Sequence, residues 1–557
     1  MSKKKLTINI ILILFLVTIS FRFLVSYLLP IFPDEAYYLY WNKFLDFGYF
    51  DHPPLVSWIG ITQEISRDPL WARLGSNLIA ALCFPISILL FKEVGLKKRT
   101  DLTKALLILH FSLCGLVFGF LITPDVPFLF TWLLSLHEAV VALKRDPKRW
   151  ITAGIATGIG IWAKYMTLML GPIFLWALIK KKGALRTPWP WLGACACLVT
   201  IAPHLAWNQQ NSWVSFKFQM GHGLSGHHNA VSLYTPDLPT PTQKLSQTEK
   251  DYGDYFFTQI KKPSSTPKKL SNVEKTIQRT KNYLSGQAGL LGFFIFPLMW
   301  TLGATILSKI DRKKSANSQN IITSTIDPNT KPLIWAATIF PLTLFGLIAL
   351  KQNVEVNWPS IYLVTGSIII VGYLNISKKW MQIAATLNLL VIGLIVLHSW
   401  QPIFDIKPNR DRILIETHGW EQLSEKIKET KKPIFADTYQ NASMLNYYQP
   451  HLNVAQLPGL TRVSELIRRK KMWTWNMKDI EQSSGFILIS YNQYPPHMEG
   501  FHILNHTELR DCPHERIEIT TVDFSRSFSP RCKTPVHRWF KTEYHIGSQN
   551  KKMLLLD

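Results

Sequence analysis

Long apolar runs recur along the first 400 residues of the chain, whereas residues 401–557 contain none. Most runs have roughly 18–22 residues, the length that an α-helix needs to cross a hydrocarbon core of about 30 Å. We therefore predict a polytopic α-helical membrane protein with about 11 transmembrane helices. The predicted spans are residues 6–29, 71–91, 105–122, 126–143, 150–163, 166–179, 188–207, 287–307, 332–350, 358–374 and 380–398. The fifth and sixth are short, and a helical hairpin that does not fully cross is the alternative there.

Residues 401–557 follow a different pattern. Residues 432–436 and 485–490 are short apolar runs typical of buried strands, and residues 420–427 have the spacing of an amphipathic helix. We predict a C-terminal soluble α/β domain over 401–557, after a transmembrane domain over 1–400.

The positive charge is concentrated in the short loops of the predicted transmembrane domain. The chain has a net charge of +24, of which residues 401–557 contribute only +4. Every second loop is basic, as the positive-inside rule requires of cytoplasmic loops: residues 92–99, 144–149, 180–182, 309–314 and 378–379. The N-terminus is therefore predicted to be cytoplasmic. Segments 30–70, 208–286 and 401–557 would face outward, which is the periplasm in a bacterium. The charge thus indicates membrane orientation and argues against nucleic-acid binding.

Two acidic motifs lie in the first predicted outward loop. Asp34 and Glu35 follow the first span directly, and Asp51 and His52 precede a Pro-Pro pair that restricts the backbone. An aromatic loop at the membrane surface can desolvate a carboxylate and raise its proton affinity, as a general base requires. The alternative for Asp34 is structural, with its side chain capping a helix that starts at Glu35.

Further charged residues are predicted at the same membrane face. Asp125 lies in a very short loop, Thr123-Pro-Asp-Val-Pro, as either a site residue or a turn former. Lys164, between two apolar halves, would bind a lipid phosphate or simply extend to the interface. Arg73, at the start of the second span, would bind a phosphate in the same way.

The remaining candidates lie in two later outward loops. His222 belongs to segment 208–286 together with two further histidines, but their spacing defines no complete set of metal ligands. Glu355 and Asn357 precede the tenth span in Glu355-Val-Asn-Trp-Pro, where a helix start with an interfacial tryptophan is the alternative. Metal ligands therefore remain unknown from the sequence.

The six cysteines do not have the spacing of a zinc site. Cys512 and Cys532 lie in the C-terminal region, where a disulfide is plausible if that region faces an oxidising compartment. The other four lie in apolar spans and are predicted to pack there: Cys83, Cys114, Cys195 and Cys197.

Four motifs together resemble the polytopic glycosyltransferases of the aminoarabinose-transferase and protein O-mannosyltransferase superfamily. The motifs are Pro33-Asp-Glu-Ala-Tyr-Tyr, Tyr49-Phe-Asp-His-Pro-Pro-Leu, Thr123-Pro-Asp-Val-Pro and Val356-Asn-Trp-Pro. The resemblance covers roughly residues 1–400. It is closest to the bacterial branch that modifies lipid A, lipopolysaccharide core or other glycans of the cell envelope.

The resemblance implies an inner-membrane transferase that moves a sugar from a polyprenyl-phosphate donor to such an acceptor at the periplasmic face. Asp34 would be the main catalytic or acceptor-orienting carboxylate, with Glu35 beside it. Asp125 would be the second acidic residue of the site, and Lys164 would contact the donor phosphate. An acceptor hydroxyl positioned by a carboxylate, and a cation facing the departing phosphate, suit this chemistry.

The motifs also depart from the family in one place. Asp51 and His52 stand where the aminoarabinose branch typically has Glu-Lys before Pro-Pro, which leaves the donor sugar and the acceptor open. Both are interpreted as substrate-binding residues. The resemblance gives no certain cofactor, and a divalent cation stays an open alternative.

Other functions fit parts of the sequence. Protein O-mannosylation is the main alternative among enzymes. A flippase or transporter for a lipid-linked sugar would show charged or broken helices at mid-membrane and a repeat. A third hypothesis is an assembly protein whose run Leu466-Ile-Arg-Arg-Lys-Lys binds anionic lipid, with a solvated helix face as the alternative. The chain has no Walker A loop, dinucleotide fingerprint or Gly-x-Ser-x-Gly elbow, which disfavours a nucleotide-driven enzyme.

Overall fold

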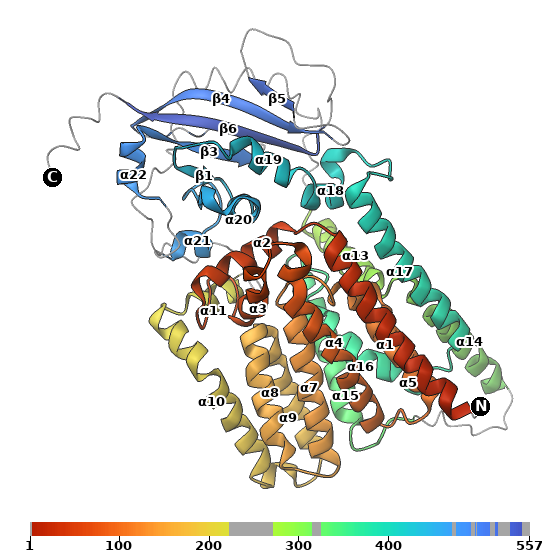
Figure 1. Cartoon of the computed structure of the whole chain (residues 1–557). Helices are drawn as coiled ribbons and strands as arrows, with labels where there is room; N and C mark the ends of the chain where they lie inside the picture. The colour runs from red at the N-terminus through yellow and green to blue at the C-terminus, as the bar shows by residue number, and fades with distance from the viewer. Residues whose placement is uncertain are drawn as a thin grey trace.

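A computed structural model of the chain contains a large helical bundle with a mixed β-sheet at one end of it (Figure 1). The structure describes residues 3–221, 271–314, 325–469, 475–491, 496, 498, 500–512, 518–521 and 535–547. Seven of the described helices are long and apolar enough to cross a membrane. The chain is therefore an integral membrane protein of mostly helical structure, as the apolar runs predicted.

The helices up to residue 400 are α1 (Lys3–Leu28), α2 (Pro33–Tyr40), α3 (Leu55–Ile59), α4 (Pro69–Glu93), α5 (Arg99–Phe111), α6 (Leu113–Val117), α7 (Asp125–Lys144), α8 (Arg149–Ala163), α9 (Leu170–Lys180), α10 (Trp189–Gln210), α11 (Val214–Met220), α13 (Asn272–Leu291), α14 (Ile295–Lys314), α15 (Lys331–Ala349), α16 (Tyr362–Tyr373) and α17 (Lys378–Trp400). Seven predicted spans fall on the long apolar helices α1, α4, α7, α10, α13–α14, α15 and α17. The other four fall on shorter helices.

Local sequence explains two of these shorter helices. Ser112 ends α5 and accepts a hydrogen bond from the Gly115 N–H, so it starts α6 inside the predicted span 105–122. Lys164 has an extended backbone that ends α8 before a short 3₁₀-helix, Tyr165–Met169, and α9. A polar residue thus interrupts each apolar run, and Lys164 marks the break between the two short spans.

Helix α7 is the most buried of the seven long apolar helices that the structure describes. Of its most apolar stretch of 18 residues, 89% is buried, against 22% for α1 and 11% for α13–α14. The first residues of α7 are therefore presented from the centre of the bundle.

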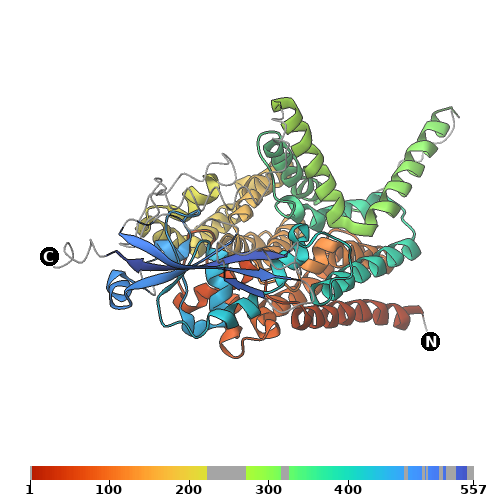
Figure 2. The same ribbon diagram turned by 90° about the horizontal axis from the view of Figure 1, so that it is seen from above.

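Figure 2 shows the green helices α13 and α14 diverging as a V at the edge of the bundle. The turn between them is at Gly292, which has a φ of 60° and lies so close to the Asn388 side chain that a Cβ would collide.

Three of the basic loops meet at the end of the bundle away from the sheet. Lys144 Nζ lies 3.2 Å from Glu93 Oε1 and 3.3 Å from Asp327 Oδ2, and Lys181 donates a hydrogen bond to the Leu143 carbonyl. These contacts join the ends of α4, α7 and α9 to the start of α15. The sequence predicted that the loops after the second, fourth and sixth spans share one side of the membrane, and the structure brings them together.

The C-terminal region combines short helices with one sheet. Its helices are α18 (Arg412–Thr417), α19 (Trp420–Ile427), α20 (Tyr439–Tyr448), α21 (Glu465–Arg468) and α22 (Met477–Gln482). Its strands are β1 (Ile434–Ala436), β2 (Ala455–Gln456), β3 (Gly485–Tyr491), β4 (Phe501–Asp511), β5 (Glu518–Thr521) and β6 (His537–Ile546). In the described residues the strand order is β2-β1-β3-β6-β4-β5, with β1 parallel to β2 and β3, and the other pairs antiparallel. The two predicted strands and the amphipathic helix are present as β1, β3 and α19.

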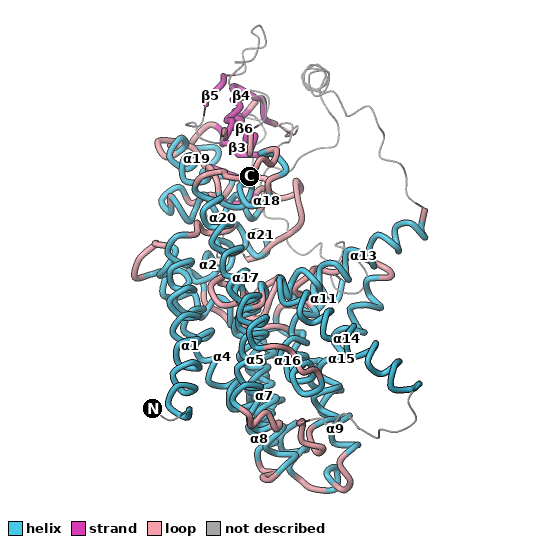
Figure 3. The backbone as a smooth tube through the Cα atoms, turned by 90° about the vertical axis from the view of Figure 1, so that its right-hand side faces the viewer, coloured by secondary structure: helices cyan, strands magenta, loops and turns pink. Residues whose placement is uncertain are grey.

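Alternating side chains of the sheet pack against two different layers. Ile487 and Ile489 of β3 belong to a core that includes residues of α20 and of α2, and Phe486 and Leu488 belong to a separate core on the other face. Helix α20 therefore lies between the sheet and α2, as the side view agrees (Figure 3). Cys512 is disulfide-bonded, which the sequence had left open, whereas Cys532 lies outside the described residues. Of the described cysteines, those of the apolar helices are free.

Candidate functional site

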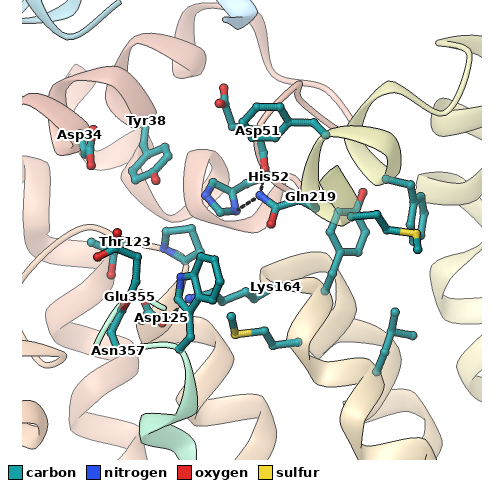
Figure 4. Close-up of a pocket in the computed structure, with 18 of the residues that line it drawn as sticks. Asp34, Tyr38, Asp51, His52, Thr123, Asp125, Lys164, Gln219, Glu355 and Asn357 are labelled. Carbon is teal, nitrogen blue, oxygen red and sulfur yellow. Dashed lines mark hydrogen bonds and ion pairs between the residues drawn. The ribbon is translucent and has the colours of Figure 1, made fainter. Parts of the chain in front are cut away.

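A cavity of about 780 Å³ lies where the helical bundle meets the C-terminal region. Its walls come from α2, the loop around Asp51, the first residues of α7, the segment after Lys164, α11, the end of α15, the Glu355–Trp358 loop and α20. Figure 4 shows Asp34, Tyr38, Asp51 and His52 on one side and Thr123, Asp125, Lys164, Glu355 and Asn357 on the other. Seven of the ten predicted site residues line it: Asp34, Asp51, His52, Asp125, Lys164, Glu355 and Asn357.

Asp34 lies in the first turn of α2 with its side chain exposed in the cavity. The protein around the cavity withdraws water from the carboxyl group, and this desolvation raises its pKa. The alternative in which Asp34 caps a helix is not what the structure has. Phe32 is the N-cap residue, and its N–H donates to the Glu35 carboxylate at 3.1 Å. Asp34 is thus available to the cavity.

Glu35 and Arg73 form a buried ion pair away from the cavity. The Arg73 guanidinium donates to both Glu35 oxygens, at 2.8 and 2.5 Å, and to the carbonyls of Ser26, Leu29 and Pro30. The Glu35 side chain is 1% exposed and that of Arg73 is 0% exposed. Neither residue lines the cavity, although the sequence placed both at the substrate. Their network instead fixes α2 to the start of α4, because every polar atom of the pair has a protein partner.

Asp125 is held by two partners that the sequence named separately. Its Oδ1 lies 2.7 Å from Lys164 Nζ, and its Oδ2 accepts a hydrogen bond of 3.1 Å from Asn357 Nδ2. The Asp125 and Lys164 side chains are each 9% exposed. These contacts connect the start of α7, the break after α8 and the loop before α16. Asp125 therefore orients two donors at the cavity wall and is not only a turn former.

Asp51 is also fully engaged. Its carboxylate accepts a hydrogen bond from the Tyr37 hydroxyl and an ion-paired hydrogen bond of 2.6 Å from Arg462 Nη1. The Gln219 side chain donates to its backbone carbonyl and lies 3.4 Å from His52 Nδ1 (Figure 4). With both carboxylate oxygens occupied, Asp51 organises the cavity wall. Substrate binding by His52 stays a prediction.

The last two candidates differ in what the structure says of them. Glu355 lines the cavity with an exposed side chain. His222 and the histidines that follow it lie outside the described residues. Among the residues that the structure describes, no group of three or more His, Cys, Asp or Glu side chains could hold a metal ion. The divalent cation stays an untested expectation.

Comparisons with known proteins agree with the motifs. Residues 51–207 match the family model described as dolichyl-phosphate-mannose-protein mannosyltransferase. The chain is 22% identical over 407 residues to the lipid A galacturonosyltransferase RgtD of Rhizobium johnstonii, with 71% of each protein covered. The chain is related to the polytopic membrane glycosyltransferases. The matched region includes Asp51, His52, Arg73, Asp125 and Lys164.

Two solved structures were also found to be similar. ArnT from Cupriavidus metallidurans in the apo state is 13% identical, with a TM-score of 0.43 over 86% of this chain and 93% of that one. The apo oligosaccharyltransferase of Archaeoglobus fulgidus is 13% identical, with a TM-score of 0.41 over 95% of this chain and 76% of that one.

Sequence reasoning missed the residues that the C-terminal region supplies to the cavity. Tyr439, at the start of α20, and Arg462, in the loop after β2, both line the cavity. The Arg462 guanidinium lies over the Tyr439 ring at 4.3 Å and over the Phe218 ring at 5.2 Å. The loop around Arg462 has no spacing or motif that marks it. Tyr37 was in a quoted motif, but nothing there indicated its bond to Asp51.

The arginines of the basic run that begins at Leu466 make contacts within the chain, in place of the lipid contact that was one hypothesis. Arg468 donates to Asn211 at 2.8 Å, and Arg469 pairs with Asp46 at 3.0 Å. Each of these two side chains is only 11% exposed. The alternative of a solvated helix face is therefore also wrong for both arginines, which face the helical bundle. The two lysines that follow lie outside the described residues.

Proposed function

We propose that the chain transfers a sugar from a polyprenyl-phosphate donor to a glycolipid or glycan of the cell envelope, with lipid A or lipopolysaccharide core as the acceptor class. One observation carries this proposal: a single cavity joins a carboxylate in a desolvated setting to a buried lysine and to an apolar wall. The dolichyl-phosphate-mannose description of the matching family and the lipid A relative support the choice of donor and acceptor.

The reaction needs a base for the acceptor hydroxyl and a cation for the leaving group. In our scheme Asp34 accepts the hydroxyl proton as the acceptor oxygen forms a bond to the anomeric carbon. The bond from that carbon to the phosphate oxygen breaks, and its electron pair leaves with the polyprenyl phosphate. Lys164 Nζ stabilises the negative charge that returns to this oxygen. Direct displacement of this kind inverts the anomeric carbon.

The apolar wall has the composition that a polyprenyl tail requires. Met166 and Met169 lie beside Lys164 in the chain, and Leu344, Phe345 and Ile348 of α15 complete that part of the lining. Thioether and branched side chains adapt to an irregular hydrocarbon chain. A donor phosphate at Lys164 would thus have its tail directed along α15 and its sugar directed toward Asp34.

We place this site at the periplasmic face of the inner membrane. In this arrangement the chain crosses about 11 times, with the N-terminus and the basic loops in the cytoplasm. Residues 401–557 form a soluble domain outside, where an oxidising compartment suits the disulfide of Cys512. The contact of the three basic loops supports this topology.

Transfer by the purified full-length chain in lipid nanodiscs tests the proposal. Candidate polyprenyl-phosphate sugars are supplied one at a time, with lipid A as the acceptor and mass spectrometry as the readout. We expect a mass increase of one sugar on lipid A, and a parallel reaction with EDTA tests the divalent cation. If no donor gives a product on lipid A, core oligosaccharide or another envelope glycan, the proposed function is wrong.

The description of the matching family favours protein O-mannosylation as the second candidate. The same nanodisc preparation distinguishes the two functions when it is given lipid A, a periplasmic protein extract and a polyprenyl-phosphate donor with a labelled mannose. Labelled protein with unlabelled glycolipid would favour this alternative. Labelled glycolipid with unlabelled protein would exclude it.

Replacing Lys164 by methionine should lower transfer by about 10–100-fold, because a hydrogen bond to a charged group contributes about 1.5–3 kcal/mol. Lys164→Arg keeps the charge near Asp125 and should retain more activity than Lys164→Met. Initial rates at saturating and limiting donor give the two kinetic constants for each variant. Lys43→Met is the matched control, because Lys43 lies in the segment 30–70 and does not line the cavity. Wild-type kinetics in Lys164→Met would show that this lysine does not contact the donor.

A further inference from the structure

The segment from Arg462 to Arg469 binds the loop at residues 44–52 through a continuous set of polar contacts. Glu465 is 0% exposed and accepts hydrogen bonds from the Phe50 N–H at 2.6 Å, from Arg468 at 2.7 Å and from Arg469 at 2.6 Å. Arg469 also donates to Asp46 and to the Phe44 carbonyl. The C-terminal segment is thus anchored to the loop that precedes Asp51.

The same segment controls the position of the Asp51 carboxylate. Arg462 Nη1 lies 2.6 Å from Asp51 Oδ1, and the Tyr37 hydroxyl donates to Asp51 Oδ2. The Glu465 N–H in turn donates to the Tyr37 hydroxyl oxygen at 2.8 Å. The C-terminal segment therefore holds Asp51 Oδ1 directly, through Arg462. It holds Asp51 Oδ2 indirectly, because Glu465 fixes the Tyr37 hydroxyl that donates to this oxygen.

We propose that Arg462 is a positioning residue of the transfer reaction, which holds Asp51 and neutralises it beside the Asp34 carboxylate at the cavity surface. This inference rests on the proposed function, because it assumes that Asp34 acts as the base. It makes residues 401–557 part of the active site. The C-terminal region thus supplies the cation that pairs with Asp51, the second carboxylate beside Asp34.

Charged and titratable groups face Asp34 from four elements. Tyr38 belongs to its own helix, Asp51 to the following loop, Tyr439 and Arg462 to the region after β1, and Arg412 and Glu416 to α18. Arg412 and Glu416 pair with each other at 2.5 Å. After desolvation, which raises the pKa of Asp34, the largest influence is Arg462, which lowers it, and Asp51 follows, which raises it. Arg462 and Asp51 therefore act on Asp34 with opposite signs.

The test is the pH dependence of kcat/KM for Arg462→Met, Asp51→Asn and the double variant in the full-length nanodisc preparation. A base must be deprotonated, so activity falls as the pH decreases through its pKa. Arg462→Met should move the acid limb up by about one pH unit, and Asp51→Asn should move it down, because nearby charges shift a pKa by about 1–3 units. The double variant, which removes both charges, should return the acid limb close to that of the wild type.

Arg538→Met is the matched control. Arg538 pairs with Glu508 at 2.6 Å, lies over the Phe540 ring and is 22% exposed, against 29% for Arg462, but it lies on β6 outside the cavity. It should keep the wild-type acid limb. If Arg462→Met does not accumulate in the membrane, the acid limb of Asp51→Asn alone tests the proposal. A downward shift supports it, and an unmoved acid limb overturns it.

Three results would have different meanings. An active wild type whose acid limb is unmoved in both single variants overturns the role of Arg462 and leaves the proposed function standing. A wild type that transfers no sugar overturns the proposed function itself. A lower kcat in Arg462→Met with an unmoved acid limb would show that the arginine is only structural.

Discussion

Asp34→Asn should lower the rate of sugar transfer by about 10²–10⁴-fold, the range that a general base contributes. The asparagine keeps the shape of the side chain but cannot accept the hydroxyl proton. Since desolvation raises the pKa of Asp34, the activity of the wild type should fall with decreasing pH at a higher pH than that at which an ordinary aspartate titrates. Initial rates at saturating donor and acceptor, measured over a range of pH, give both quantities.

Binding and stability should change little in the same variant. The donor contacts proposed for Lys164 are intact, so the Kd for the polyprenyl-phosphate sugar should stay close to that of the wild type. The melting temperature should be equal or higher, because an amide is less costly to desolvate than a carboxylate. Asp68→Asn is the control, because it is the same substitution at a residue that does not line the cavity. A wild-type rate in Asp34→Asn would leave the exposed carboxylate of Glu355 as the next candidate base.

The second large effect is expected at Glu465. Glu465→Gln leaves Arg468 and Arg469 without their shared buried carboxylate, and loss of one partner from a buried ion pair costs about 3–5 kcal/mol. The contact between the C-terminal segment and residues 44–52 should therefore open more often. Hydrogen exchange at the Phe50 amide, whose N–H donates to the Glu465 carboxylate, should become faster by about 10²–10³-fold. Transfer activity should decrease with it, because Arg462 and Tyr439 would leave the cavity.

Glu508→Gln provides the matched comparison. Glu508 is also 0% exposed and pairs with two arginines, Arg510 at 3.0 Å and Arg538 at 2.6 Å, but all three lie on β4 and β6. Its substitution should destabilise the sheet while the Phe50 amide stays protected and transfer continues. Equal exchange at Phe50 in both variants would mean that Glu465 does not secure the contact between the two regions.

The hydrophobic pattern predicted most of the helical architecture. Seven of the expected spans are long apolar helices, and β1, β3 and α19 lie where the C-terminal pattern placed them. The pattern was less accurate where one polar residue ended a helix, as at Ser112 and Lys164. Apolar periodicity reports which residues can be buried, but the end of a helix depends on single backbone conformations that periodicity does not record.

The sequence predicted many residues of the candidate site, but not the contacts between them. Asp125, Lys164 and Asn357 were each identified from their place between apolar spans, yet nothing local shows that they bind one another across 39 and 232 residues of chain. Glu35 and Arg73 carry the same signals as true cavity residues, and only the tertiary packing separates them. Arg462 had no signal at all, because a lone arginine in an irregular loop is indistinguishable from any surface cation.

The distance along the chain between Asp51 and Arg462 bears on how the protein is made. They are 411 positions apart, and synthesis at about 5–20 residues per second separates them by roughly 20–80 s. The earlier half of the cavity thus enters the membrane well before its counter-charge exists. A nascent or truncated chain would carry the carboxylates in an unorganised loop, so donor lipids would not be consumed until translation had reached the end of α21.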